Sequence, residues 1–258
     1  MDLRGKSCKI TWLEKFIWGR VKIMLEVQKI DVFYGEIQIL KEVSLRVNNG
    51  EFVVLLGPNG HGKSTLLKTI CGLHPVESGN INFCGSSIIG LSPQKIVASG
   101  LIYVAEDRHL FPEMTVMENL KLGAYNFRAR DKIDESFDFV FQLFPRLGER
   151  KKQLASTLSG GESQMLALGR GIMSCAKFMA IDEPSLGLSP LLRADVFEKI
   201  TLINKNGIGI LLVEQNIERV AAFSDRVYLM EDGKIVFAGT ADDALKNKHL
   251  KEVLLGIS

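Results

Sequence analysis

The chain has 258 residues, of which 46% are hydrophobic, and its formal net charge is +2. This length fits one large domain or two small ones, and the apolar content can build a substantial core. The near balance of charge gives no overall case for a nucleic-acid or acidic partner. The sequence has no run of about 18 apolar residues and therefore predicts no membrane-spanning helix.

The cysteines lie far apart and form no CxxC pair, which argues against a disulfide framework or a zinc site. They are Cys8, Cys71, Cys84 and Cys175. We expect reduced, mostly buried thiols. The N-terminus lacks a compact apolar region followed by a small-residue cleavage site, so we expect no secretory signal and a cytosolic chain by default.

Residues 1–23 differ in character from the rest of the chain. Leu13, Phe16, Ile17 and Val21 fall at helical spacing among basic residues, which fits a short amphipathic helix on a membrane surface or a partner. Two other interpretations stay open, a poorly ordered tail or a natural start at Met24, where strand-like sequence begins. We favour these two over the helix.

The first half of the chain begins with predicted strands. Residues 25–47 alternate and favour strands, and Asn48-Asn49-Gly50 predicts a turn. Residues 51–56 form a short apolar run that predicts a buried strand. Residues 66–70 predict the first turns of a helix.

Between that strand and that helix lies a pattern typical of a phosphate-binding loop. Its residues are Gly57, Pro58, Asn59, Gly60, His61, Gly62, Lys63, Ser64 and Thr65. The glycines let backbone N–H groups approach phosphate oxygens, and the helix dipole adds partial positive charge there. Lys63 would reach the β- and γ-phosphates, and Ser64 would offer its hydroxyl to Mg²⁺. The strand and helix on either side favour nucleotide binding over a simple glycine-rich turn.

The middle of the chain changes from strands to helices. Residues 77–79 predict a turn, and residues 80–83 and 101–104 predict strands. From Thr115 to about Gly148 the pattern is helical and rich in aromatic residues, with a break expected at Pro145. We expect these aromatic side chains to be core or partner surface. They are Tyr125, Phe127, Phe137, Phe139, Phe141 and Phe144.

A second glycine cluster, Leu158-Ser159-Gly160-Gly161-Glu162, opens another predicted helix. It is a potential anion site, and the simpler alternative is a helix start capped by Ser159. Residues 178–181 then predict an apolar strand that ends in Asp182 and Glu183. In a phosphate-loop enzyme the first acid can hold Mg²⁺, often through water, and the second can act on the attacking water.

The last third of the chain predicts a helix over 190–206 and a buried strand over 208–213. Asp232-Gly233, between strand-like residues 226–230 and 234–237, predicts a type I′ hairpin. A short terminal helix is expected after it.

The phosphate loop, Leu158–Glu162 and Ile181-Asp182-Glu183-Pro184, in this order and at these separations, resemble the ATP-binding subunits of ABC transporters. The resemblance covers about residues 24–258. Four further segments look most like the second of the two ATPase subunits in branched-chain amino acid importers of bacteria and archaea. They are Val104-Ala105-Glu106, residues 111–116, residues 185–188 and residues 212–216.

The resemblance implies roles for residues that match the family's motifs. Tyr34 would stack on adenine. Ser159, Gly160 and Gly161 would contact the γ-phosphate held by an opposite subunit, with two ATP molecules sandwiched head to tail. Asp182 would take the Mg²⁺-water position, Glu183 would be the general base, and residues 185–188 would cross the dimer interface.

Two positions, Glu106 and Gln215, depart from the wider family. Glu106 stands where most members have a glutamine that senses Mg²⁺ and the attacking water, and its carboxylate can still reach Mg²⁺. Gln215 stands where most have a histidine, and an amide donates a hydrogen bond but cannot gain a proton. Both substitutions are usual in the branched-chain subgroup, and they leave the rate at each site open. His61 sits where alanine is frequent, and we interpret its imidazole as incidental.

The resemblance also implies a fold. This is an α/β phosphate-loop NTPase core with a central, mainly parallel sheet, an antiparallel β subdomain and a helical subdomain over about residues 107–170. Residues 1–23 would form an extension and residues 24–258 the ATPase domain. The helical subdomain would dock onto a membrane-spanning partner.

The function implied is an ATPase that uses ATP and Mg²⁺ to drive import of branched-chain or related amino acids. Its partners would be permease subunits, a second ATPase subunit in a hetero- or homodimer and, indirectly, a solute-binding protein, with no nucleic acid. It would lie peripherally on the cytoplasmic side of the membrane. Alternatives are an importer ATPase for an amide, urea or lipid, a soluble ABC ATPase acting on ribosomes or DNA, and a module that holds ATP without hydrolysis.

Overall fold

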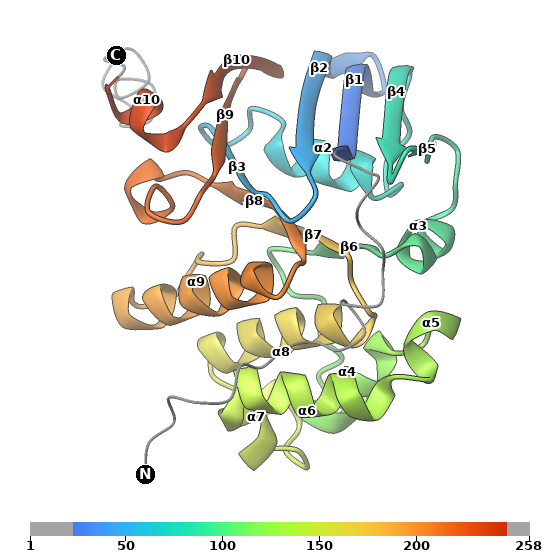
Figure 1. Ribbon diagram of the computed structural model, residues 1–258, viewed down its shortest axis with the longest axis vertical. Coiled ribbons are helices and arrows are strands. Elements are labelled where there is room, and N and C mark those ends of the chain that lie inside the picture. The colour runs from blue at the N-terminus through green and yellow to red at the C-terminus, as the bar shows by residue number, and fades with distance from the viewer. Residues whose placement is uncertain (1–22, 247–258) are drawn as a thin grey trace.

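The structure is a computed structural model that describes residues 23–246. Within this part, the chain forms two sheets and a layer of helices (Figure 1). The expectations for residues 1–22, including Cys8 and an amphipathic helix, lie outside the described residues. Cys71, Cys84 and Cys175 are free thiols, as expected.

The first sheet is antiparallel and has the strand order β2-β1-β4-β5. Its strands are β1 (Ile23–Tyr34), β2 (Ile37–Asn48), β4 (Ser78–Phe83) and β5 (Ser86–Ser87). The expectation of a turn over residues 77–79 was wrong for Ser78 and Gly79, which begin β4. Gly79 is required for close backbone contact, because a Cβ there would lie 2.3 Å from the carbonyl oxygen of Lys29.

The second sheet has the order β10-β9-β3-β8-β7-β6 and is parallel except for β10. Its strands are β3 (Phe52–Leu56), β6 (Leu101–Val104), β7 (Phe178–Asp182), β8 (Gly209–Glu214), β9 (Arg226–Glu231) and β10 (Lys234–Gly239). Asp232 and Gly233 both have positive φ, 45° and 77°, between β9 and β10. This is the backbone of the predicted type I′ hairpin.

Strand β3 lies inside the second sheet, between β9 and β8, and all of its residues are buried. Val53 and Leu55 face the antiparallel sheet and helix α2 (Lys63–Ile70). Phe52, Val54 and Leu56 face the helices on the other side. A parallel strand covered on both faces has no polar side, which explains the continuous apolar run before the phosphate loop.

The remaining helices include a layer below the second sheet in Figure 1. They are α3 (Pro93–Ser99), α4 (Val116–Gly123), α5 (Phe127–Arg130), α6 (Ile133–Leu143), α7 (Pro145–Glu149), α8 (Gly160–Met173), α9 (Pro190–Lys205) and α10 (Ala241–Lys246). Two 3₁₀ turns cover Ala155–Thr157 and Ile217–Arg219. Thr115 caps α4, and Pro145 begins α7 just after α6 ends, so the predicted helical stretch and its break are confirmed.

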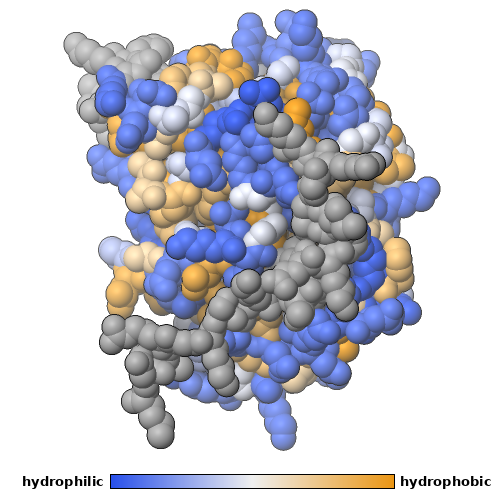
Figure 2. Space-filling model, in the orientation of Figure 1, coloured by the Kyte–Doolittle hydropathy of each residue, from blue (hydrophilic) through white to orange (hydrophobic). Residues whose placement is uncertain are grey.

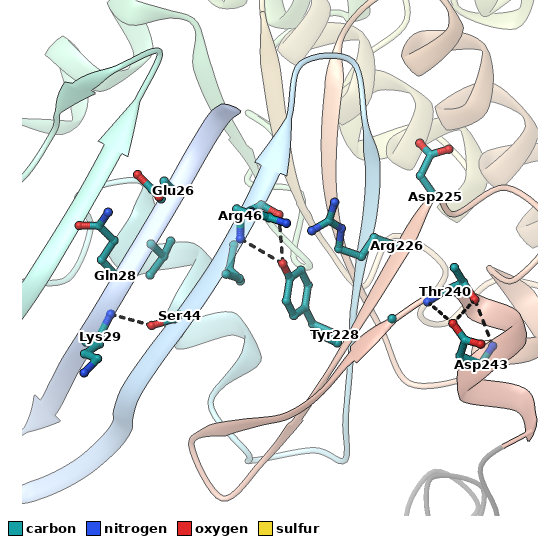
Figure 3. A pocket seen from close by; sticks show the side chains of 14 residues that line it. Glu26, Gln28, Lys29, Ser44, Arg46, Asp225, Arg226, Tyr228, Thr240 and Asp243 are labelled. Atoms are coloured by element: carbon teal, nitrogen blue, oxygen red, sulfur yellow. Dashed lines mark hydrogen bonds between the residues drawn. The ribbon is translucent and has the colours of Figure 1, made fainter. Parts of the chain in front are cut away.

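A groove of about 1000 Å³ separates β1 and β2 from β9, β10 and α10 (Figure 3). Tyr228 lines the groove and connects β9 to β2, because its hydroxyl accepts from the Arg46 N–H at 3.2 Å and donates to the Arg46 carbonyl at 3.3 Å. On the face drawn in Figure 2, hydrophilic side chains cover most of the surface and hydrophobic ones form small groups. Between residues 23 and 246, no helix has the length and apolarity to cross a membrane.

Candidate nucleotide site

A pocket of about 420 Å³ lies where β3, β6, β7 and β8 end. Parallel strands bring their carboxyl ends to one edge of a sheet, where ligands bind in open α/β folds. The pocket gathers most of the predicted site residues from distant parts of the chain. Its lining residues are Tyr34, Ile39, Asn59, Gly60, Gly62, Lys63, Ser64, Thr65, Glu106, Glu183, Leu186 and Gln215.

The loop between β3 and α2 needs glycine at two of its positions. Gly57 has φ of 151°, and a Cβ there would lie 2.3 Å from the Met230 carbonyl oxygen. Gly62 has φ of 98°, and a Cβ there would lie 2.8 Å from the Leu40 side chain. The loop therefore packs directly against β9 and β2, and this packing fixes its shape.

Helix α2 begins at this loop with Gly62 at its N-cap, with no capping side chain and no acidic residue in its first turn. Its first N–H groups are thus left for another acceptor, which makes the helix start an anion site. The buried Lys63 ammonium donates to the carbonyls of Gly57 and Pro58, each at 2.8 Å. Burial lowers the pKa of Lys63, and nearby carboxylates oppose that change.

Asp182, the last residue of β7, is held by two hydroxyls. Ser64 donates to its Oδ1 at 3.0 Å, and Tyr103 donates to its Oδ2 at 2.8 Å. Burial raises the pKa of Asp182, against the effect of these two hydrogen bonds. Tyr103 was not among the residues predicted for the site, although a lone hydroxyl near the end of an apolar strand is a signal that could identify it.

Glu183 follows β7 in a left-handed conformation, with φ of 39°. Its Oε2 accepts a hydrogen bond from the Gln215 amide at 2.6 Å, and its Oε1 lies 3.8 Å from the Lys63 ammonium. Burial raises the pKa of Glu183, and these two neighbours oppose that rise. The carboxylate is therefore oriented by an amide from the next strand while it faces the pocket.

Glu106 and Tyr34 line other parts of the same pocket. Glu106 follows β6, and its charge contributes to the raised pKa of Glu183. The Tyr34 side chain is 45% exposed, and its ring meets His74 edge-on, with centroids 4.3 Å apart. Tyr34 thus provides an accessible aromatic ring at the rim of the pocket.

The imidazole of His61, for which we expected no role, connects the loop to the β9–β10 hairpin. Its Nδ1 accepts from the Asp232 N–H at 2.9 Å, and the His61 carbonyl accepts from the Gly233 N–H at 3.2 Å. The side chain is therefore not incidental to the fold. It holds the phosphate loop against the hairpin turn.

The second glycine cluster forms the start of α8. Ser159 accepts from the Glu162 N–H, and Glu162 accepts from the Ser159 N–H, so the predicted cap is a capping box. The described residues that line the phosphate-loop pocket do not include Ser159, Gly160 or Gly161. A single copy of the chain leaves these three residues outside the site.

Comparison with known proteins places this geometry in a family. The family model described as ABC transporter matches residues 40–186. The high-affinity branched-chain amino acid transport ATP-binding protein BraG of Pseudomonas aeruginosa is 43% identical over 90% of this chain and 100% of its own length. The probable branched-chain amino acid transport ATP-binding protein LivF of Archaeoglobus fulgidus is 36% identical over 91% of this chain and 99% of its own.

Solved structures agree with this assignment. A nucleotide-free ATP-binding cassette from an ABC transporter superposes with a TM-score of 0.80 at 26% identity, covering 90% of this chain and 98% of its own. An ATP-binding cassette in its ADP conformation gives a TM-score of 0.78 at 27% identity, covering 91% and 99%. The predicted fold is therefore confirmed. The chain belongs to the ABC transporter family, and it is a nucleotide-binding ATPase of that family.

Proposed function

We propose that this chain is the ATP-hydrolysing subunit of an importer for branched-chain or related amino acids. The observation that carries the ATPase assignment is the pocket that joins the phosphate loop to Asp182, Glu183 and Gln215. The choice of solute rests on two relatives that are named for branched-chain amino acid transport. Both are matched along nearly their whole length.

The residues of the pocket fit ATP with Mg²⁺. The phosphates would lie against the N–H groups at the start of α2 and beside Lys63. Ser64, Asp182 and Glu106 offer the hard oxygen atoms that Mg²⁺ prefers, and the Ser64 and Asp182 oxygens are already 3.0 Å apart. A bound Mg²⁺ would supply charge neutralisation for the phosphates.

Glu183 is proposed as the general base. It would orient a water molecule and take its proton as the water attacks the γ-phosphate, giving ADP and phosphate. Gln215 would hold the Glu183 carboxylate through the amide hydrogen bond. This arrangement argues against a module that holds ATP without hydrolysis.

The position of the second glycine cluster supports a dimer. Ser159, Gly160 and Gly161 lie outside the pocket of their own chain, and the first two are exposed. We propose that they complete the pocket of a second ATPase subunit, and that residues 185–188 cross the interface. ATP binding would close this dimer, and hydrolysis with phosphate release would let it open.

A groove of about 560 Å³ between the second sheet and α4 and α8 supports a permease contact. Its lining is mainly apolar and includes Phe111, Leu122 and Tyr125, which are among the exposed large hydrophobic residues. We propose that the helical region, about residues 107–170, binds the permease here. The chain would then lie on the cytoplasmic side of the membrane and act with a solute-binding protein only indirectly.

Purification of the tagged chain from its native membrane tests this function. We expect two different permease subunits and a second, distinct ATPase to accompany it, and we expect the reconstituted complex to take up leucine, isoleucine or valine with ATP. Uptake of an amide, urea or a lipid instead would overturn the proposed solute. Recovery of ribosomes, DNA or no membrane protein would overturn the transporter assignment and leave the ATPase.

A further inference from the structure

Glu214 is a buried carboxylate that the proposed mechanism does not use. It ends β8, and its side chain is 2% exposed. Oε1 accepts from the Ser185 hydroxyl at 2.5 Å and from the Arg219 guanidinium at 3.4 Å, and Oε2 accepts from the Gln215 N–H at 2.7 Å. A buried carboxylate is costly unless it is paired and hydrogen-bonded, and these donors satisfy it.

The donors to Glu214 come from two different loops. Ser185 belongs to the loop after β7, which contains Glu183, whereas Gln215 and Arg219 follow β8. The two strands are neighbours in the sheet, so both loops leave the same edge. Glu214 therefore connects the loop that carries the proposed base to the loop that carries its amide partner.

Two more hydrogen bonds connect Glu183 to β8 and to the loop that follows it. The Gln215 amide donates to the Glu183 carboxylate at 2.6 Å, and the Glu183 N–H donates to the Val213 carbonyl at 3.2 Å. Glu183 has a φ of 39°, which is unfavourable for a residue with a side chain. Such a conformation persists when its surroundings determine it in several ways.

We propose that Glu214 is a positioning residue, which holds the Glu183 carboxylate in its reactive place through Ser185 and Gln215. The inference rests on the proposed function of Glu183. In a Glu214→Gln variant one carboxylate oxygen becomes an NH₂ group, which would face a donor instead of accepting from it. The two loops would separate locally, and Glu183 would lose its fixed orientation.

The expected kinetic signature follows from where the contacts lie. The phosphate loop and α2 hold the nucleotide and make no described hydrogen bond to Glu214. Loss of Glu214 should therefore lower kcat while KM for ATP stays nearly constant. A general loss of structure would change both quantities.

The test measures ATP hydrolysis and nucleotide affinity in the complete complex with its partner subunits. We expect Glu214→Gln and Ser185→Ala to lower kcat by about tenfold or more, with KM and nucleotide affinity within about twofold. The matched control is Glu51→Gln. Glu51 also accepts from a backbone N–H and an arginine, those of Asn48 and Arg226, but it precedes β3 at the other end of the sheet. The kcat of the Glu51→Gln variant should stay within about twofold of the wild-type value.

Combination with Glu183→Gln gives the decisive comparison. If Glu214 acts through Glu183, then Glu214→Gln should not lower further the residual rate of the Glu183→Gln variant. Additive losses, a normal kcat in Glu214→Gln, or an equal loss in Glu51→Gln would each overturn the proposal. If Glu183→Gln alone hydrolyses ATP normally, Glu183 is not the base, and the proposed function and this inference are both wrong. This outcome differs from a failure of the Glu214 inference alone, in which Glu183→Gln stalls hydrolysis and Glu214→Gln does not lower kcat.

Discussion

Asp182 and Glu183 are adjacent carboxylates that the fold gives different surroundings. Asp182 completes a strand and accepts from two hydroxyls, whereas Glu183 leaves the strand with positive φ and accepts from an amide. Burial raises the pKa of both. These different partners support the two different roles proposed for the successive residues, Mg²⁺ binding for Asp182 and activation of water for Glu183.

Removing the Tyr103 hydroxyl should weaken the proposed Mg²⁺ site without changing the phosphate loop. Tyr103 fixes one oxygen of Asp182, so that the other remains beside Ser64. Partners of a metal ligand typically contribute about tenfold or more to metal affinity. We expect Tyr103→Phe to reduce by about tenfold the gain in nucleotide affinity that Mg²⁺ provides, with unchanged affinity in EDTA.

The matched control for this measurement is Tyr228→Phe. Tyr228 is also a tyrosine on a strand of the second sheet, but its hydroxyl bonds the backbone of Arg46. Nucleotide titrations with and without Mg²⁺ should show no change in the Mg²⁺ effect for the control. An equal loss in both variants would mean that the Tyr103 hydroxyl has no particular role at the metal.

Glu183→Gln should retain ATP and stall turnover. The amide cannot accept the proton of the attacking water, while the phosphate loop is unchanged. General base catalysis contributes about 10²–10⁴-fold, so we expect hydrolysis to fall by at least about 100-fold with nucleotide affinity preserved. Single-turnover hydrolysis and ATP retention would measure both. Near-normal hydrolysis would remove Glu183 from the role of base.

Residues with local signals could be predicted from the sequence. The phosphate loop follows a pattern of fixed spacing, and Asp182-Glu183 ends an apolar strand. Tyr103 and Glu214 depend on contacts between segments that are distant in the chain, since Tyr103 reaches an aspartate 79 positions away. No local pattern predicts which oxygen such a hydroxyl will contact.

At the scale of elements, the approach of α4 to α8 depends on Gly123. A Cβ at this position would lie 2.2 Å from the Arg170 carbonyl oxygen and 2.9 Å from the Met173 Cβ. Alanine normally favours a helix over glycine by about 1 kcal/mol. At this position we expect alanine to destabilise the protein instead, because overpacking costs about 1–3 kcal/mol. Gly123→Ala should therefore lower the free energy of unfolding.

Gly148→Ala is the control for this prediction. Gly148 is also helical, in α7, and the nearest atoms to a Cβ there would belong to the Phe141 side chain, at 3.5 Å or more. This substitution should leave the free energy of unfolding unchanged or raise it. Urea denaturation of both variants measures the difference, and equal stabilities would contradict a tight α4–α8 contact.

The types of the elements could be predicted from hydrophobic periodicity and from capping and turn residues, whereas some element boundaries could not. The continuous apolar runs, the Ser159 cap and the Asp232-Gly233 turn are local signals that the fold obeys. Ser78 and Gly79 look like a turn because of their composition. They join β4 because Ser78 pairs with Asp31 in a neighbouring strand, which local sequence cannot show.

At the scale of the whole molecule, one segment connects the nucleotide pocket to the proposed permease groove. Glu106 lines the pocket, and Arg108, His109 and Phe111 line the groove. Arg170 of α8 fixes this segment, because its guanidinium donates to the carbonyls of His109 and Arg108 at 2.6 and 2.8 Å. A movement of Glu106 when nucleotide binds or is hydrolysed would therefore be passed along a few residues of the backbone to the groove between the second sheet and the helices.

Exposed aromatic residues on the helical side should bind the permease. Phe111 is 49% exposed and Tyr125 is 76% exposed, and both line the groove. A Phe111→Ser/Tyr125→Ser double variant should lose the burial of both rings in the complex, worth about 3 kcal/mol or more. We expect at least about 100-fold weaker association with the permease, with nucleotide affinity of the isolated chain unchanged.

Val236→Ser provides the control for this surface. Val236 lies on β10, away from the groove lining, and is 49% exposed, the same fraction as Phe111. Co-purification from membranes and titration into permease-containing vesicles should give wild-type association for this variant. If the double variant binds the permease normally, the helical region is not the docking surface, and the exposed aromatic residues require another explanation. If the control also loses binding, the contact extends to β10, at the opposite edge of the second sheet from β6, and is not confined to residues 107–170.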